Sequence, residues 1–118
     1  PTAIGWLPEE KALYGAPQLK SWQTIQKSHA IANGCYIAAI NRVGFEASID
    51  NNSGIEFWGN SFIVDPQGTS IAAADDKNET ILYAEIKKEL AETQRQTWPF
   101  FRDRRVDSYN GLMELYNS

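Results

Sequence analysis

The sequence predicts a mixed α/β fold in which a helix packs against a sheet. Two observations indicate this: an amphipathic helix runs directly into the apolar segment 35–40, and further strand-like segments separated by polar turns follow it. Its 118 residues suit one small domain or a piece of a larger one, because domains most often contain about 100–150 residues. A hydrophobic content of 42% with four Trp, five Tyr and five Phe excludes a disordered chain.

The first two segments of the chain differ in their content of Pro and Gly. Residues 1–18 contain three Pro and two Gly among short apolar pieces, so they are predicted to be an ordered loop. An amphipathic helix is predicted from residue 19 onward, and the Asn33-Gly34 pair favours a left-handed stop. Its apolar face recurs every three or four positions and consists of Leu19, Trp22, Ile25, His29 and Ala32.

Strands account for most of the middle of the chain. Segment 35–40 has no polar alternation, which predicts a strand covered on both faces. Segment 41–54 is rich in Gly, Asn and Ser and is predicted to be a loop at the end of that strand, where open α/β sheets place ligands. Segments 57–64, 69–74 and 81–86 are predicted to form an antiparallel meander.

Two polar turns and a short helix complete the expected elements. Asp65-Pro66-Gln67-Gly68 has the residues of a type I turn, and a second turn is expected at 75–78. A charged helix is predicted over 87–96, ended by Trp98-Pro99. The tail that follows keeps too many apolar residues for a free terminus, so we expect it to dock on this subunit or another.

Charge and cysteine content limit the possible partners. Eleven basic against fifteen acidic residues give a net charge of −4, which argues against nucleic acid as a partner. The three arginines of the segment 102–105 fit a phosphate or RNA patch less well than a subunit interface built from salt bridges and aromatic anchors. With Cys35 as the single cysteine, no zinc pattern and no long apolar run, we expect a cytoplasmic protein without a membrane span. Since the chain starts at Pro1 rather than Met, we expect a processed or partial chain.

The predicted elements do not enclose a core. One long helix, one apolar strand and a meander cannot cover both faces of a sheet. Each large apolar side chain left in water costs about 1.5–3 kcal/mol, which is large beside a typical domain stability of about 5–15 kcal/mol. We therefore expect the chain to be the latter part of a larger α/β fold.

Several motifs in register carry a resemblance to a known family. They are His29-Ala30-Ile31-Ala32-Asn33-Gly34, Asn41-Arg42-Val43-Gly44, Phe57-Trp58-Gly59-Asn60-Ser61-Phe62, Asp65-Pro66-Gln67-Gly68 and Trp98-Pro99-Phe100-Phe101-Arg102-Asp103-Arg104-Arg105. Together they resemble the C-terminal part of the nitrilase superfamily of carbon-nitrogen hydrolases, and within it the amidases that act on N-carbamoylputrescine. Val106 departs from this pattern, which often has Pro there.

The resemblance implies that residues 1–118 are the C-terminal portion of a single four-layer αββα sandwich. It also implies a Glu-Lys-Cys catalytic set upstream of Pro1, so that this chain alone would be inactive, and no metal or organic cofactor. The implied reaction converts N-carbamoylputrescine to putrescine, ammonia and carbon dioxide, in a homo-oligomer joined through the C-terminal tail. The alternatives are a sister amidase resembling β-ureidopropionase, or a non-catalytic module that binds a partner or sugar on Trp6, Trp58 and Trp98.

Two reactive residues are interpreted as structural. Cys35 starts an apolar strand and is followed by Tyr36 rather than by the Trp of the family's nucleophile motif, so we expect it to pack in the core. His29 is next to Ser28, but adjacent helical residues do not face each other. We therefore expect His29 to be a hydrogen-bonded residue between helix and sheet rather than a catalytic one.

The candidate substrate-binding residues come from the resemblance. The opening segment is similar to the loop that lines the pocket in that family, Asn41 ends the apolar strand and is a candidate to bridge loops at the mouth of the site, and Trp58 is a candidate wall. The full set is Thr2, Ala3, Ile4, Gly5, Trp6, Asn41 and Trp58. A substrate with an ammonium end also calls for a carboxylate, and the sequence does not choose among Glu9, Glu10, Glu46 and Glu56.

Overall fold

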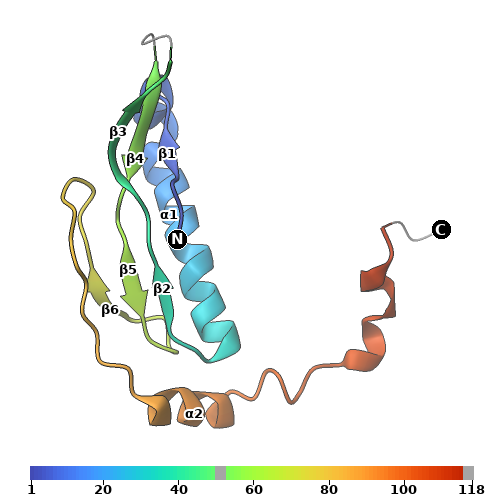
Figure 1. Cartoon of the computed structure of the whole chain (residues 1–118). Coiled ribbons are helices and arrows are strands. Elements are labelled where there is room, and N and C mark those ends of the chain that lie inside the picture. Colours follow the sequence, from blue (N-terminus) through green and yellow to red (C-terminus); the bar gives the residue numbers. More distant parts are fainter. Residues whose placement is uncertain (50–52, 116–118) are drawn as a thin grey trace.

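The computed structural model describes residues 1–49 and 53–115 and has a mixed α/β fold (Figure 1). A long helix, α1 (Pro8–Asn33), lies along one face of two three-stranded antiparallel sheets. One sheet has the order β1 (Gly5–Trp6), β4 (Gly54–Trp58), β3 (Val43–Ala47). The other has the order β2 (Ile37–Ala39), β5 (Phe62–Val64), β6 (Ser70–Ala73).

Helix α1 starts eleven residues before the predicted position, so the prediction of a loop over 1–18 is wrong beyond Leu7. Pro8 occupies the first turn, where a missing N–H costs nothing. The side chain of Glu10 accepts a hydrogen bond from the N–H of Leu7 at 3.1 Å, and the Trp6 ring packs over Gly15, where a Cβ would lie 3.4 Å from the ring, an ordinary van der Waals contact. Tertiary packing therefore overrides the Pro and Gly signals.

The buried face of α1 also differs from the predicted one. Leu19 and Trp22 face the sheet as expected, but the buried stripe continues through Gln26 to Ala30, while Ile25 and His29 are exposed. The expectation that His29 is held between helix and sheet is therefore wrong. The helix does end as predicted, because Gly34 is left-handed (φ 54°, ψ 47°) and its N–H reaches the carbonyls of Ala30 and Ile31.

The two sheets are joined by a bent two-stranded ribbon. One of its strands consists of β2, residues 40–42 and β3, and the other consists of β4, residues 59–61 and β5. Strand β2 pairs with β5 and β3 pairs with β4, both antiparallel, so the connections 40–42 and 59–61 bend at the same level. Gly59 (φ 52°) and Asn60 (φ 55°) form the bend on one side. The predicted loop at 41–54 is therefore partly wrong, since it contains β3, and the predicted strand 57–64 is two strands.

The hairpin after β5 is confirmed, whereas the third strand of the meander is not. The N–H of Gly68 donates to the carbonyl of Asp65 at 2.9 Å, closing the expected turn, and β5 pairs with β6. Residues 81–86 form no strand, and exposed residues alternate with half-buried Leu82 and Ala84, so no three-stranded meander exists there. The predicted short helix is confirmed as α2 (Lys88–Thr97), and two 3₁₀ turns follow, η1 (Val106–Ser108) and η2 (Asn110–Met113).

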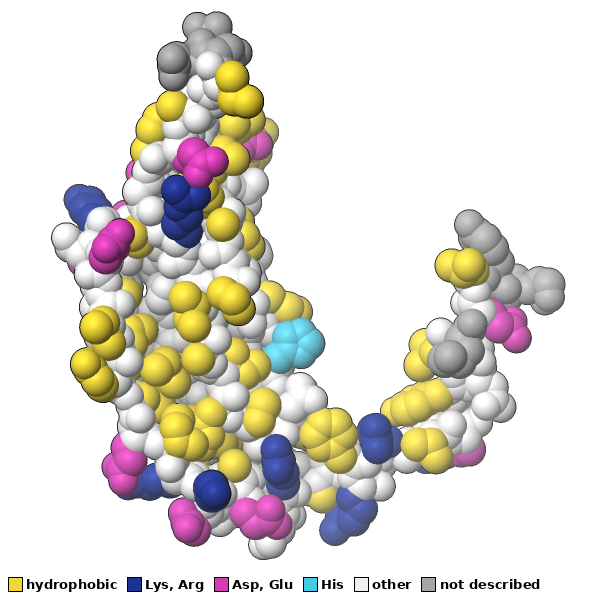
Figure 2. Space-filling view, in the orientation of Figure 1, with side chains coloured by type: hydrophobic (Ala, Val, Ile, Leu, Met, Phe, Trp, Pro, Cys, Tyr) yellow, Lys and Arg dark blue, Asp and Glu magenta, His cyan; other side chains and the backbone are white. Residues whose placement is uncertain are grey.

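The core lies between α1 and the sheets and leaves the opposite sheet face open. It is built from Trp6, Trp22, Ala30, Ala39, Trp58, Phe62 and Val64. In β2, Ala39 is buried while Ala38 and the following Ile40 are exposed, so this chain covers one face of the strand. Cover of the other face by further polypeptide stays a prediction. Figure 2 shows hydrophobic side chains gathered over β2, β5 and β6.

The C-terminal tail leaves the body after α2 and extends away from it (Figure 1). Its described large apolar side chains are all exposed, including Tyr109 at 41%, Phe101 at 48%, Phe100 at 49% and Val106 at 65%. Of the two expected docking places, this chain's own body does not cover the tail within residues 100–112. Docking on another subunit stays a prediction.

Candidate substrate-binding site

The side chain of Asn41 lies at the centre of the predicted site. It is 6% exposed, and its carboxamide oxygen accepts hydrogen bonds from the N–H of Ile4 at 2.9 Å and the hydroxyl of Thr2 at 2.8 Å. Its carboxamide nitrogen donates to the carbonyls of Ile4 at 3.1 Å and Gly59 at 3.2 Å. Both donors and both acceptor positions are used within the chain, so Asn41 acts as a bridge between segments.

Backbone hydrogen bonds hold the opening segment against the bend of the ribbon. The N–H of Thr2 donates to the carbonyl of Ile40 at 2.7 Å, and the N–H of Arg42 donates to the carbonyl of Thr2 at 3.2 Å. The N–H of Trp58 then donates to the carbonyl of Ile4 at 3.2 Å. Residues 2–6 therefore run as a fixed extended segment from the bridge between Thr2 and Asn41 into β1.

Gly5 lets this segment approach β4 closely. A Cβ at Gly5 would lie 2.4 Å from the carbonyl oxygen of Glu56 and 2.5 Å from the Ile55 side chain. Any larger residue would push the opening segment away from the strand. The structure thus brings the seven predicted residues 2–6, 41 and 58 into one unit.

The two tryptophans of this unit are buried rather than open. Trp6 is 6% and Trp58 4% exposed, and their rings pack edge to face with centroids 4.9 Å apart. Trp22 of α1 lies 6.2 Å from Trp58. Trp98 instead packs with Phe100 at the start of the tail. A shared platform of Trp6, Trp58 and Trp98 is therefore excluded, because two of these rings have no free face.

The carboxylates expected near an ammonium end have other partners. Glu56 forms an ion pair with Lys11 at 2.5 Å, Glu46 with Arg42, and Glu10 caps the start of α1. Glu9 is exposed on the first turn of α1. Three of the four carboxylates thus have a local structural role.

Asn41 also lines a pocket of about 370 Å³. Its lining comes from the bend of the ribbon and from the turn after β6, and consists of residues 40–43, Ser61, Ala74 and Asn78-Glu79-Thr80. The sequence indicated Asn41 but not Ser61, Glu79 or Thr80. Ser61 belongs to a segment predicted to be a strand, and Glu79 and Thr80 lie between a predicted turn and a predicted strand. Only the pairing of β5 with β6 brings them beside Asn41.

The turn at 75–78 fixes one wall of this pocket. The carboxylate of Asp75 accepts hydrogen bonds from the N–H groups of Lys77 at 2.8 Å and Asn78 at 2.7 Å and from the Asn78 side chain at 2.8 Å. The hydrogen bonds from Asn78 are the main cause of a lowered Asp75 pKa, about 2. The carboxylate is therefore ionised throughout the neutral range, and the turn stays capped.

Cys35 lies away from this site and is not a core residue. It is half-buried and lines a wider pocket of about 700 Å³ beside α2, together with Lys88, Glu89 and Arg95. The expectation that Cys35 packs in the core is therefore wrong.

Within residues 1–49 and 53–115, no group of three or more His, Cys, Asp or Glu side chains could hold a metal ion.

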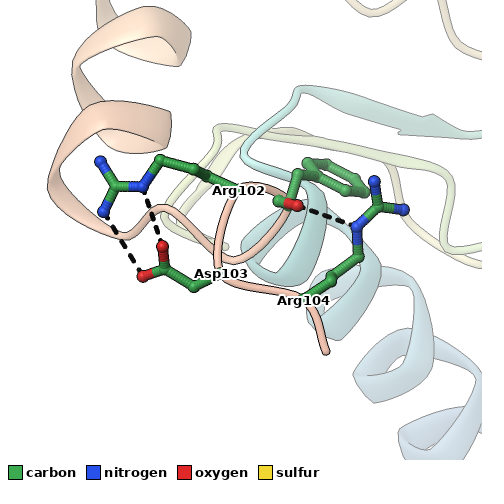
Figure 3. Close-up of polar contacts among 4 residues, drawn as sticks. Arg102, Asp103 and Arg104 are labelled. Carbon is green, nitrogen blue, oxygen red and sulfur yellow. Dashed lines mark hydrogen bonds and ion pairs between the residues drawn. The ribbon is translucent and has the colours of Figure 1, made fainter. Parts of the chain in front are cut away.

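The arginines of the tail pair with their neighbours. Arg102 contacts Asp103 at 2.8 Å, and Arg104 donates to the carbonyl of Phe101 at 2.9 Å (Figure 3). Arg105 pairs with Asp107 at 2.5 Å and lowers the pKa of that carboxyl. The tail thus presents these two local ion pairs, and the Arg104 guanidinium lies 5.3 Å from the centre of the Phe101 ring. In the described part of the chain, no helix is long and apolar enough to cross a membrane.

Known proteins resemble the chain over almost all of its length. The sequence model of the carbon-nitrogen hydrolase family matches residues 10–96. The N-carbamoylputrescine amidase of Arabidopsis thaliana is 39% identical over 118 residues, which cover 98% of this chain and 38% of that protein. The citrullinase of Francisella tularensis is 37% identical over 116 residues, which cover 98% of this chain and 39% of that protein.

Solved structures also match the chain in three dimensions. The crystal structure of a carbon-nitrogen hydrolase from Helicobacter pylori superposes with a TM-score of 0.90 at 48% identity, covering 98% of this chain and 40% of that one. The chain therefore spans about two fifths of the length of the proteins it matches.

Proposed function

Because the chain belongs to the carbon-nitrogen hydrolase family, we propose that it is the C-terminal portion of an amidase acting on N-carbamoylputrescine. The reaction adds one water and yields putrescine, ammonia and carbon dioxide. The observation that carries this proposal is the 37–39% identity, over 98% or more of the chain, to N-carbamoylputrescine amidases and a citrullinase. All of these enzymes have names that refer to a ureido or carbamoyl substrate.

In this reaction the residues of this chain line the binding site and orient the substrate. Thr2 to Gly5 run as a fixed segment, so their backbone groups can be held beside the reacting carbon without reorganisation. Asn41 is a positioning residue, because its carboxamide is spent on Ile4, Thr2 and Gly59. The rings of Trp6 and Trp58 are buried and pack together, which holds the end of this segment against the core.

The groups that break the C–N bond belong, in this proposal, to polypeptide outside residues 1–118. A Cys thiolate would attack the carbamoyl carbon, a Glu would transfer protons and a Lys would stabilise the tetrahedral intermediate. Such a thiolate mechanism requires no metal or organic cofactor. The open face of β2, β5 and β6 supports the proposal of a four-layer sandwich, since exposed Ala38 and Ile40 call for a covering layer.

The proposed enzyme acts in the cytoplasm as a homo-oligomer joined through the tail. The exposed Phe100, Phe101 and Val106 support a tail that docks on a second copy. A single cysteine among 118 residues is compatible with a reducing compartment.

The test is ammonia release by the full-length polypeptide that contains this chain. We expect turnover of N-carbamoylputrescine with a higher kcat/KM than that of N-carbamoyl-β-alanine, the substrate of a β-ureidopropionase, or of citrulline. A preference for either carboxylate-bearing substrate would overturn the substrate assignment and leave the family intact. Residues 1–118 alone are expected to release no ammonia, and turnover by them would overturn the placement of the nucleophile.

A further inference from the structure

We propose that the pocket beside Asn41 holds the cationic end of an amine-bearing substrate, with Glu79 supplying the negative charge. This inference rests on the proposed function and names how its substrate is selected. The pocket has a volume of about 370 Å³ and is lined by residues 40–43, Ser61, Ala74 and residues 78–80. Glu79 was not among the four carboxylates that the sequence suggested.

The wall that carries Glu79 is held in place by the bend of the ribbon. The N–H of Asn60 donates to the carbonyl of Asp75 at 3.0 Å, and the N–H of Ala74 donates to the carbonyl of Ser61 at 2.8 Å. Gly59 packs so closely that a Cβ there would lie 2.8 Å from the carbonyl oxygen of Asp75. The residues on the N-terminal side of Glu79 are therefore held by the ribbon, and this fixes the position of Glu79 at the pocket.

The charges around the pocket favour a cation. Glu79 forms no ion pair with any other residue of the described ranges. Arg42, which also lines the pocket, is neutralised by Glu46 and stacks over the Phe57 ring at 4.3 Å. The turn itself adds Asp75 and Asp76 against the single positive charge of Lys77.

Three consecutive side chains match the three donors of an alkylammonium group. Glu79 offers a carboxylate, and the Thr80 hydroxyl donates to the carbonyl of Asn78 at 3.2 Å, which leaves its lone pairs free to accept. The Asn78 side-chain nitrogen is bonded to Asp75, so its oxygen is the remaining acceptor. All three residues line the pocket.

The pocket lies within a short diamine's reach of the opening segment. Thr2 hydrogen-bonds through its backbone to Ile40 and Arg42, which both line the pocket. Neighbouring strands lie about 4.8 Å apart, and a four-carbon chain with bonds of roughly 1.5 Å spans a similar distance. A carbamoyl group beside residues 2–5 and an ammonium beside Glu79 are therefore compatible with one molecule.

The experiment compares two substrates on three forms of the full-length enzyme. N-carbamoylputrescine carries the ammonium, and N-butylurea has the same chain length without it. Glu79→Gln is expected to raise KM for N-carbamoylputrescine about tenfold, the loss of one hydrogen-bonded charge pair, and to leave KM for N-butylurea unchanged. Glu85→Gln is the matched control, because Glu85 lies in the same exposed segment, pairs with Lys87 and does not line the pocket. It should change neither value.

A second measurement separates this inference from the proposed function. Calorimetric binding of 1,4-diaminobutane should be lost in Glu79→Gln and kept in Glu85→Gln, whether or not the ureido compounds are hydrolysed. Equal effects on both substrates, or diamine binding that ignores Glu79, would overturn the pocket assignment while leaving the amidase intact. Diamine binding that depends on Glu79 without hydrolysis of N-carbamoylputrescine would overturn the function and keep the pocket. A matching melting temperature in both variants excludes misfolding as the cause.

Discussion

The carboxamide of Asn41 pairs with both backbone polar groups of Ile4, accepting from its N–H at 2.9 Å and donating to its C=O at 3.1 Å. The Asn41 side chain thus makes the two hydrogen bonds that the backbone of a neighbouring strand would otherwise make with Ile4. The opening segment is joined to the bend of the ribbon at a point where the regular ladder stops. The position of residues 2–6 therefore depends on one buried amide.

Replacing Asn41 should therefore destabilise the protein and misplace the opening segment. In Asn41→Leu the N–H and C=O of Ile4 and the carbonyl of Gly59 lose their partner, which costs about 2–4 kcal/mol if two such groups stay unsatisfied. Asn110→Ala, in the exposed tail, should stay within about 0.5 kcal/mol of the wild type. Urea unfolding of the full-length protein measures both, and equal stabilities for the two variants would contradict the bridging role.

Gly59 and Gly44 offer a matched pair of substitutions. Both have positive φ, 52° and 93°, so alanine is strained at each. At Gly44 a Cβ would meet nothing within 4 Å, whereas at Gly59 it would lie 2.7 Å from the Val43 side chain and 2.8 Å from the carbonyl oxygen of Asp75. Gly59→Ala should cost at least about 1 kcal/mol more than Gly44→Ala in unfolding free energy. An equal loss in both variants would mean that the turn at Asp75 yields freely.

The tryptophan cluster should dominate the stability of the helix–sheet core. Trp58 packs against Trp6 at 4.9 Å and Trp22 at 6.2 Å, so Trp58→Ala is expected to cost about 3–5 kcal/mol. Trp98 is 51% exposed, and Trp98→Ala should cost less than about 1.5 kcal/mol, because a half-exposed ring loses little burial. Thermal melts of the two variants provide the measurement, and a greater loss at Trp98 would indicate that the tail rather than the cluster organises the fold.

The turn at Asp75 should make a pH-dependent contribution. Its folded pKa is about 2 against an ordinary value of 3.8, so its hydrogen bonds stabilise the folded state fully above 3.8 and this contribution is lost as pH falls toward 2. The stability difference between the wild type and Asp75→Asn should therefore shrink between pH 4 and about 2. Urea titrations at a series of pH values test this, and a constant difference down to pH 2 would refute it.

The tail should determine the oligomeric state. Phe100, Phe101 and Val106 are about half to two-thirds exposed in the single chain, and burying such side chains stabilises an interface by about 1.5–3 kcal/mol each. Phe101→Ser with Val106→Ser is expected to shift the full-length protein toward monomer in sedimentation velocity. Leu13→Ser, which changes a residue of α1 that is 72% exposed, is the control. An unchanged oligomer in the double variant would exclude this tail as the contact.

Local chemistry predicted the elements whose ends are set by a few neighbouring residues. The stop at Gly34, the Asp65–Gly68 turn and helix α2 follow from residues that are adjacent in sequence, and all three are present. Elements that depend on distant partners were misread. Helix α1 begins at Pro8, where the side chain of Glu10 accepts from the N–H of Leu7 and the Trp6 ring packs over Gly15. Strand β3 pairs with β4, although its own residues look like a loop.

The site divides in the same way. Asn41 and the opening segment were suggested by a resemblance in motif, and the structure brings them together through hydrogen bonds across more than thirty-five residues of chain. Glu79 carries no local signal, because one exposed glutamate in a polar turn is like any other. Its place beside Asn41 follows from the Asn60–Asp75 contact, which no periodicity in the sequence predicts.

Tyr36 anchors the start of α2 with one hydroxyl, which accepts from the N–H of Lys87 at 3.2 Å and donates to its C=O at 3.3 Å. At the other end of α2, Arg95 reaches the carbonyl of Asn33 at 3.4 Å. These two attachments set the direction in which everything beyond Trp98 leaves the body. Because α2 is held at both ends, its orientation fixes the direction of the tail. A small rotation of α2 would therefore move the distant residues of the tail by a much larger distance than α2 itself.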